Sequence, residues 1–187
     1  SVAENAGTAS LNVTLDAASE KTITVDYVSS AGTACHCSSD FAAISSTTLT
    51  FTAGQTSKTI SATISDDSVD EMDETFDIIV SNASNATIAV ATGTVTITDD
   101  DPAPTISIND VTTADEAAAS TNLVATLSAA SEKTITVDFA TSDGTATVSN
   151  DYTAATGTLT FAAGETTKNI PIAVLADAFD EVDETVT

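Results

Sequence analysis

The chain lacks arginine and tryptophan and has little lysine, histidine or cysteine. Its 187 residues include 28 Asp or Glu residues but only four Lys, one His and two Cys, and the formal net charge is −24 at pH 7. Binding to nucleic-acid phosphates or to an anionic membrane surface requires clustered Lys and Arg side chains, so we expect neither. Because His36 is the only histidine, a Ser–His–Asp or Cys–His triad could form only there, and a histidine-rich zinc site cannot form.

Long hydrophobic runs and a disulfide framework are also missing. No apolar run approaches the roughly 18 residues of a membrane-spanning helix, and no basic segment followed by an apolar one opens the sequence. We therefore expect any secretion signal to lie outside these residues. A hydrophobic content of 42% is too high for a disordered acidic tail, so the chain should fold. With abundant acid and few covalent crosslinks, a metal ion is the first candidate for stabilising that fold.

Two parts of the chain repeat each other. The segment AASEKTITVD at Ala17–Asp26 returns unchanged at Ala129–Asp138, 112 positions later, and DSVDEMDE from Asp67 corresponds to DAFDEVDE from Asp177. Between these segments the alignment loses single residues only where loops are expected. A period near 111 residues has the size of a domain rather than of a solenoid repeat.

The repeats predict three parts. Residues 1–101 form a first repeat whose first strand is missing, 102–104 form a linker with two prolines, and 105–187 form a second repeat whose C-terminal strands are missing. We expect both ends to be cut from a longer tandem array.

Short segments within each repeat alternate apolar residues with Thr or Ser. TITVDYV, LTFTA, KTISATI and FDIIV show this period of two, which is typical of half-buried strands. Thr, Val and Ile also favour sheets over helices. About seven such strands per repeat predict an all-β protein made of tandem immunoglobulin-like antiparallel β-sandwiches, the second one truncated.

Most acidic residues lie at the ends of the predicted strands rather than on strand faces. A closed sandwich brings alternate strand ends together at one pole. Nine carboxylates of the first repeat are therefore expected to converge beside the linker: Glu4, Asp40, Asp66, Asp67, Glu71, Glu74, Asp99, Asp100 and Asp101. Without neutralisation these groups would repel one another and have raised pKa values.

Calcium suits such a pole. Ca²⁺ takes about six to eight oxygen ligands at roughly 2.3–2.6 Å, so the nine carboxylates could hold about two or more ions, whereas Mg²⁺ prefers to keep its waters. An EF-hand loop, D-x-D-x-D-G, does not occur. The alternative without metal is a solvated acidic surface, and the repeated D-x-x-D-E-x-D-E spacing argues against it.

Several motifs together resemble the Calx-beta domain family. They are E-N-x-G near the first predicted strand, G-T-A followed by S-D-[YF], T-[FV]-x-x-G-x-T-x-K-x-I, D-D-x-x-x-E-x-x-E-x-F and a closing V-T-I-x-D-D-D. Each motif alone is weak, but the joint pattern is specific and covers almost the whole chain. The resemblance implies sandwiches of Calx-beta type, with Ca²⁺ ions held by the nine carboxylates at the pole that faces the next domain.

The resemblance also implies metal ligands in the second repeat. They are Glu116, Asp151, Asp177, Glu181 and Glu184. Ala176 stands where the first repeat has Asp66, and no closing acidic triplet follows within the sequence, so we expect a weaker site. The acids interleaved with the ligands are expected to lie behind them or in solvent: Asp70, Asp73, Asp180 and Asp183.

Two features of the sequence allow chemistry other than calcium binding: the paired acids and the segment Cys35-His36-Cys37. A glycosidase uses two carboxylates that flank a sugar, but an aromatic content of 4% without Trp leaves little to stack on one, so we expect no enzyme. Cys35-His36-Cys37 has no counterpart in the second repeat and precedes Asp40. It is an exposed loop without special function, a disulfide crosslink between chains, or a thiolate–imidazole metal clip. A bridge between the two cysteines is at the edge of the allowed Cα separation.

From these observations we expect a calcium-binding structural or adhesive module of a repetitive extracellular or cell-surface protein, in which Ca²⁺ at the domain junction rigidifies the array. Its expected partners are neighbouring repeats, copies of itself or a cell or matrix surface, without nucleic acid or membrane insertion. Two alternatives stay open. One is a regulatory Ca²⁺-sensor domain of a larger membrane transporter, and the other is a filament subunit completed by strands of another chain.

Overall fold

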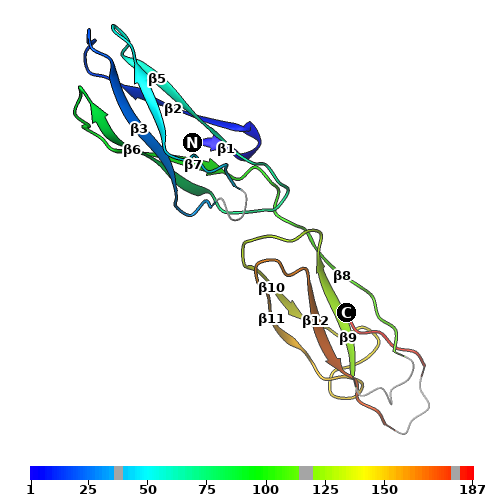
Figure 1. Ribbon diagram of the computed structural model, residues 1–187. Helices are drawn as coiled ribbons and strands as arrows, with labels where there is room; N and C mark the ends of the chain where they lie inside the picture. Colours follow the sequence, from blue (N-terminus) through cyan, green and yellow to red (C-terminus); the bar gives the residue numbers. More distant parts are fainter. Residues whose placement is uncertain (36–39, 114–119, 178–181) are drawn as a thin grey trace. The chain divides into compact units, whose positions relative to one another are not determined.

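The computed structural model describes residues 1–35, 40–113, 120–177 and 182–187, and β-strands dominate them (Figure 1). Contacts within the chain divide it into two compact units. The first comprises Ser1–Ser68 and Met72–Asp101, and the second comprises Pro102–Thr187 and Val69–Glu71. The short segment Val69–Glu71 therefore folds with the second unit, although it lies inside the first repeat of the sequence.

The first unit is a sandwich of two sheets. Its elements are β1 (Val2–Ala3), the 3₁₀ turn η1 (Glu4–Ala6), β2 (Thr8–Thr14), β3 (Ile23–Ala31), β4 (Thr47–Phe51), β5 (Ser57–Thr63), β6 (Glu74–Ser84) and β7 (Thr92–Thr98). One sheet has the order β1-β7-β6-β3-β4, and the other pairs β2 with β5. The short β1 runs parallel to β7, and the other pairs are antiparallel. The prediction of an all-β, immunoglobulin-like sandwich is confirmed.

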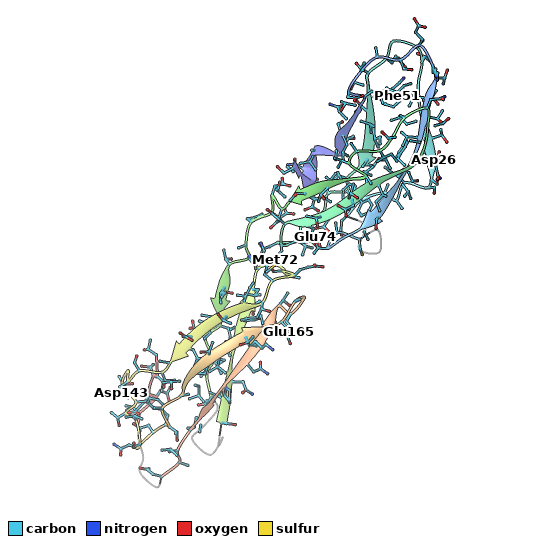
Figure 2. All side chains as sticks on the ribbon, turned by 90° about the vertical axis from the view of Figure 1, so that its left-hand side faces the viewer. Asp26, Phe51, Met72, Glu74, Asp143 and Glu165 are labelled. Carbon is cyan, nitrogen blue, oxygen red and sulfur yellow. The ribbon has the colours of Figure 1, made fainter. Side chains whose placement is uncertain are left out.

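Alternation along the strands builds the core of this sandwich. In β5, Ile60 and Ala62 are buried while Thr59, Ser61 and Thr63 are exposed, as the period of two predicts. A second buried cluster around Phe51 fills the other end of the unit. Phe51 and Glu74 lie at opposite ends of the first unit, so the acidic pole and this second cluster are well separated (Figure 2).

A pair of stacked phenylalanines lies directly beneath the acidic pole. The rings of Phe41 and Phe76 are stacked, with centroids 4.1 Å apart and an angle of 9° between the planes, and both side chains are buried. Phe41 immediately follows Asp40, and Phe76 comes two residues after Glu74. Burial of these rings thus fixes the backbone on which the two carboxylates stand.

The second unit contains counterparts of β2, β3, β4 and β5, and it begins with one further strand, β8. Its strands are β8 (Ile106–Ile108), β9 (Ser120–Leu127), β10 (Ile135–Ala140), β11 (Thr156–Phe161) and β12 (Thr167–Ala173). They form one sheet of order β12-β9-β8 and a pair of β10 with β11. Among the residues that the structure describes, no helix is long and apolar enough to cross a membrane.

The same close approach of two backbone segments occurs in both units, and it requires a glycine in each. Ala34 N donates to Thr75 O at 3.0 Å, and Ala146 N donates to Thr185 O at 3.1 Å. A Cβ on Gly32 would collide with the carbonyl oxygen of Thr75, and a Cβ on Gly144 would collide with that of Thr185. The last residues of the sequence therefore enter the second unit as the start of β6 enters the first.

The stacked pair gives a first prediction. Phe76→Ala should destabilise the first unit by about 3–5 kcal/mol, because it removes a fully buried ring and leaves a cavity against Phe41. Chemical denaturation followed by circular dichroism measures the change. Val90→Ala, at a side chain that is 76% exposed, is the matched control and should stay within about 0.5 kcal/mol of the parent. Equal stability of the two variants would contradict the packing described above.

Candidate metal centre

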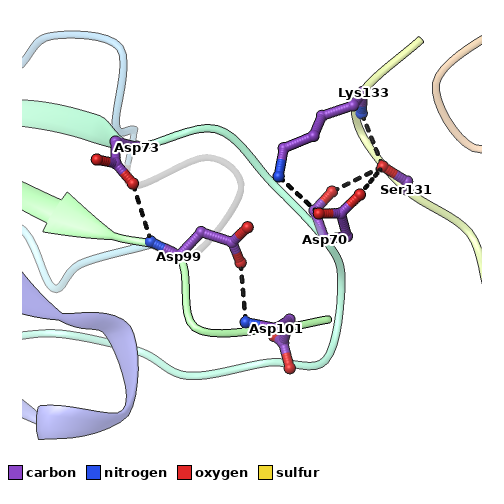
Figure 3. A network of polar contacts seen from close by, with 6 residues as sticks. All are labelled: Asp70, Asp73, Asp99, Asp101, Ser131 and Lys133. Carbon is purple, nitrogen blue, oxygen red and sulfur yellow. Dashed lines mark hydrogen bonds and ion pairs between the residues drawn. The ribbon is translucent and has the colours of Figure 1, made fainter. Parts of the chain in front are cut away.

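The first group of carboxylates surrounds the end of β7. Glu4 in η1, Asp99 and Asp101 each offer an oxygen, and these oxygens all lie within 4.8 Å of one another. Glu4 is only 7% exposed, and its Oε1 accepts a hydrogen bond from the amide of Asp67 at 3.2 Å. Asp99 is held by the chain itself, because its amide donates to Asp73 Oδ1 at 3.3 Å and its Oδ1 accepts from the amide of Asp101 at 3.1 Å (Figure 3).

Within this group, Asp101 gives the clearest indication of a cation-binding site. Its Oδ2 is buried and has no hydrogen-bond partner among the described residues. Burial raises the pKa of Asp101, and the charges of Asp100, Asp99 and the 66–67 pair raise it further. A buried carboxylate oxygen without a donor costs free energy, and a bound cation would remove that cost.

Glu4 is under the same electrostatic stress. Burial raises its pKa above the ordinary value of 4.5, and the nearby charges of Asp67, Asp101 and Asp66 add to the shift, while the hydrogen bond from Asp67 opposes it. Two acidic groups in one place therefore hold their protons more tightly than isolated carboxylates do. This is the pattern expected where negative charge converges without a counter-ion.

A second group lies around the stacked phenylalanines. Asp40, Glu71 and Glu74 each offer a carboxylate oxygen, again within 4.8 Å of one another. Asp40 is oriented by the amide of Cys35, which donates to its Oδ2 at 2.7 Å. Cys35 is disulfide-bonded, so its sulfur is not a free thiolate for a metal clip. His36 and Cys37 lie outside the described residues.

Three of the nine predicted ligands of the first repeat belong to neither group. Asp66 and Asp67 are exposed but close enough to raise the pKa values of Glu4 and Asp101. Asp100 is also exposed, and its carboxylate accepts hydrogen bonds from the backbone amide and the side-chain amide of Asn5. The acids of the pole thus form two groups of three carboxylates that could hold a metal ion, with the other acids at their rim.

In the second unit the predicted set is only partly assembled. Asp151 is oriented as Asp40 is, because the amide of Thr147 donates to its Oδ2 at 2.6 Å. This hydrogen bond is the largest cause of its lowered pKa, and an interaction with Glu184 also contributes. Asp177 is exposed. Within the second repeat's described residues, no three ligand groups meet as they do in the first repeat, while Glu116 and Glu181 lie outside the described ranges.

Asp70 has a role that the sequence did not reveal. We expected it behind the ligands or in solvent, but it is 5% exposed and belongs to the second unit. Its carboxylate lies 2.6 Å from Lys133 Nζ and 2.7 Å from Ser131 Oγ (Figure 3). The hydrogen bonds from Lys133 and Ser131 hold the pKa of Asp70 below its usual range. Asp73, by contrast, is exposed, and its Oδ1 accepts the hydrogen bond from the amide of Asp99.

The donor chemistry of the pole fits a hard divalent cation. Both groups consist of carboxylate oxygens alone, and one oxygen of Asp101 has no other partner among the described residues. Calcium prefers oxygen ligands and tolerates the irregular geometry that mixed Asp and Glu side chains provide. Soft metals would select sulfur or imidazole ligands, which these two groups do not contain.

Comparisons with known proteins identify the family. The profile of the Calx-beta domain matches residues 1–101 and 99–187. The chain belongs to the Calx-beta domain family. Among solved structures it resembles the CBD12 region of CALX1.2, at 29% identity and a TM-score of 0.50, covering 98% of this chain and 74% of that one. It also resembles the calcium binding domain CBD12 of CALX1.1, at 30% identity and a TM-score of 0.51, covering 93% and 71%. The comparison with curated protein sequences found no match.

The crowding in this Calx-beta pole gives a second prediction. In chelator at pH 7, Glu4→Gln should stabilise the first unit by about 0.5–1 kcal/mol, because the amide keeps an acceptor for Asp67 but removes a buried charge. Chemical denaturation measures the change. Asp16→Asn, an exposed position after β2, is the matched control and should be neutral.

The same residue sets a pH dependence. A folded-state pKa raised above 4.5 means that the folded protein binds this proton more tightly than the unfolded chain does. Stability without metal should therefore fall as the pH rises above 4.5 and through the raised pKa of Glu4, and Glu4→Gln should flatten part of that slope. Identical slopes in parent and variant would show that Glu4 is not under the stress described here.

Proposed function

We propose that this chain is a calcium-binding structural module of a tandem array. The observation that carries the proposal is the buried Oδ2 of Asp101, which has no hydrogen-bond partner in the described part of the chain and lies beside Glu4 and Asp99. The names of the CALX structures, which describe calcium binding domains, support the choice of ion. When bound, Ca²⁺ would supply positive charge and a coordination shell, and the protein would supply the converging carboxylates.

The two groups would have different tasks. Glu4, Asp99 and Asp101 would hold one ion at the end of β7, and Asp40, Glu71 and Glu74 would hold another beside the stacked phenylalanines. The exposed acids at the rim add negative potential that attracts cations. Because Asp99–Asp101 lead directly into Pro102, an ion held there restricts the backbone of the linker. We infer that calcium stiffens the junction between consecutive repeats.

A structural or adhesive role outside the cell, or on its surface, accounts best for the composition. A net charge of −24 keeps a long array soluble and extended, and the near-verbatim repeat suits a rod built from identical parts. Its partners would be neighbouring repeats, copies of itself or a cell or matrix surface. For extracellular modules, Kd values of roughly 10⁻⁴–10⁻³ M are usual, so the sites would fill at millimolar calcium.

The structural neighbours favour a second candidate function. CBD12 of CALX1.1 and CALX1.2 resembles this chain across both repeats. A regulatory calcium sensor within a larger transporter is therefore the alternative. Such a sensor would bind calcium more tightly, with a Kd of about 10⁻⁷–10⁻⁵ M.

Calcium titration of the whole chain by calorimetry tests the proposal. We expect saturable binding that Glu4→Gln weakens at least about tenfold and Asp16→Asn leaves unchanged, since Glu4 contributes an oxygen to the first group and Asp16 does not. A Kd near 10⁻⁴ M favours the structural module, and a Kd below about 10⁻⁵ M favours the sensor. Absence of saturable binding would refute both.

Stiffening has its own measurement. Small-angle scattering in calcium should give a longer and less variable particle than scattering in chelator. At 1 mM calcium and a Kd near 10⁻⁴ M, each site should also add about 1.4 kcal/mol of stability. Binding without any change in the scattering profile would retain the calcium site and refute its mechanical role.

A further inference from the structure

The turn Ser131–Lys133 of the second unit forms a binding site for an acidic residue, Asp70. Ser131 Oγ lies 2.7 Å from Oδ2 and 2.9 Å from the carbonyl oxygen of Asp70, and the amide of Glu132 donates to the same carbonyl at 3.0 Å. Lys133 Nζ completes this binding site with an ion pair of 2.6 Å to Oδ1 of Asp70 (Figure 3). Ser131 is 2% exposed and Asp70 is 5% exposed, so Asp70 is buried in this contact with a partner for each of its carboxylate oxygens.

The first unit contains the same turn, Ser19–Lys21, in an identical ten-residue segment. Its backbone is already in the receiving conformation. Lys21 N donates to Ser19 Oγ at 3.0 Å, and Gly54 N donates to Ser19 O at 2.9 Å. The corresponding two distances in the second unit are also 3.0 and 2.9 Å. The turn therefore takes this shape whether or not an acidic residue is bound to it.

What differs is the partner. Ser19 is only partly buried and Lys21 is exposed, and among the described ranges no carboxylate forms an ion pair with the Lys21 ammonium. Two of the four lysines in a chain with 28 acids occupy this one position of the repeat. Lys21 is one of few cationic side chains in this acidic protein, and it lies on a preformed turn. It is therefore suited to bind an acidic segment.

We propose that the Ser19–Lys21 turn is a docking site for the acidic loop of another repeat of this sequence, bound as the Asp70 loop is bound by Ser131–Lys133. The recognised feature is an extended backbone that presents one Asp with a free carbonyl beside it, as in the segment D-x-x-D-E-x-D-E. Each repeat would then both offer an acidic loop and receive one. The inference rests on the proposed tandem array but does not depend on calcium.

The test adds a donor loop in front of the chain. Residues 1–112 are placed directly before Ser1, so that the added copy supplies its own Asp70 at the spacing found in this sequence. Amide hydrogen exchange by NMR then reports on Glu20, the counterpart of Glu132, whose amide bonds to the Asp70 carbonyl. We expect exchange at Glu20 to slow at least about tenfold relative to the 187-residue chain. The Glu132 amide, protected in both proteins, is the internal control.

Four substitutions test whether the protection is specific. Asp70→Ala in the added copy, or Lys21→Ala in the receiving repeat, should return the Glu20 amide to its unprotected rate, and Lys21→Arg should restore protection. In the original chain Lys21→Ala should change nothing, whereas Lys133→Ala should speed exchange at Glu132. Unchanged exchange at Glu20 in the extended, folded protein would overturn the proposal. Calcium calorimetry on the same protein separates the two ideas, because intact binding with an unprotected Glu20 refutes the docking site alone.

Discussion

The crowding of carboxylates at one end of the first unit is the constraint on which its other features depend. A chain with four lysines and no arginine has almost no cationic side chains for neutralising this charge. Among the described residues, the ion pairs of Lys133 and Lys168 are with Asp70 and Glu165, and neither of these acids belongs to the two carboxylate groups. The pole is therefore left with raised pKa values at Glu4 and Asp101, and a cation from solution is the remaining means of neutralising it.

The hydrophobic core keeps these charges from moving apart. Phe41 and Phe76 are stacked and buried on the chain segments that carry Asp40 and Glu74, so repulsion between the carboxylates cannot be relieved by a backbone shift without opening the core. The β-sandwich thus keeps the carboxylates close together despite their repulsion, and a bound cation would relieve that repulsion. A flexible acidic tail of the same composition would simply expand.

Comparison of the two repeats separates scaffold from site. Asp151 accepts from the amide of Thr147 as Asp40 accepts from that of Cys35, so the orienting hydrogen bond does not need a cysteine. Tyr152 follows Asp151 as Phe41 follows Asp40, and it is buried in the same way. The local backbone that carries Asp40 and Asp151 is therefore alike in both units, while Ala176 in place of Asp66 removes one charge from the second repeat.

The sequence by itself determined the strands, the duplication and the strand-end position of the acids. Period-two alternation and repeated spacing are patterns among residues close together in the sequence, so they can be recognised without the fold. It also indicated that carboxylates would converge, since a sandwich has few ends. Only the tertiary structure decided how they divide into two groups and that Asp100 accepts hydrogen bonds from Asn5. It also decided that Asp101 has a buried oxygen to which none of the described residues donates a hydrogen bond. Asp70 shows the reason: its neighbours in sequence are metal-ligand candidates, but its partners are Ser131 and Lys133, more than sixty positions away, and only folding brings them together.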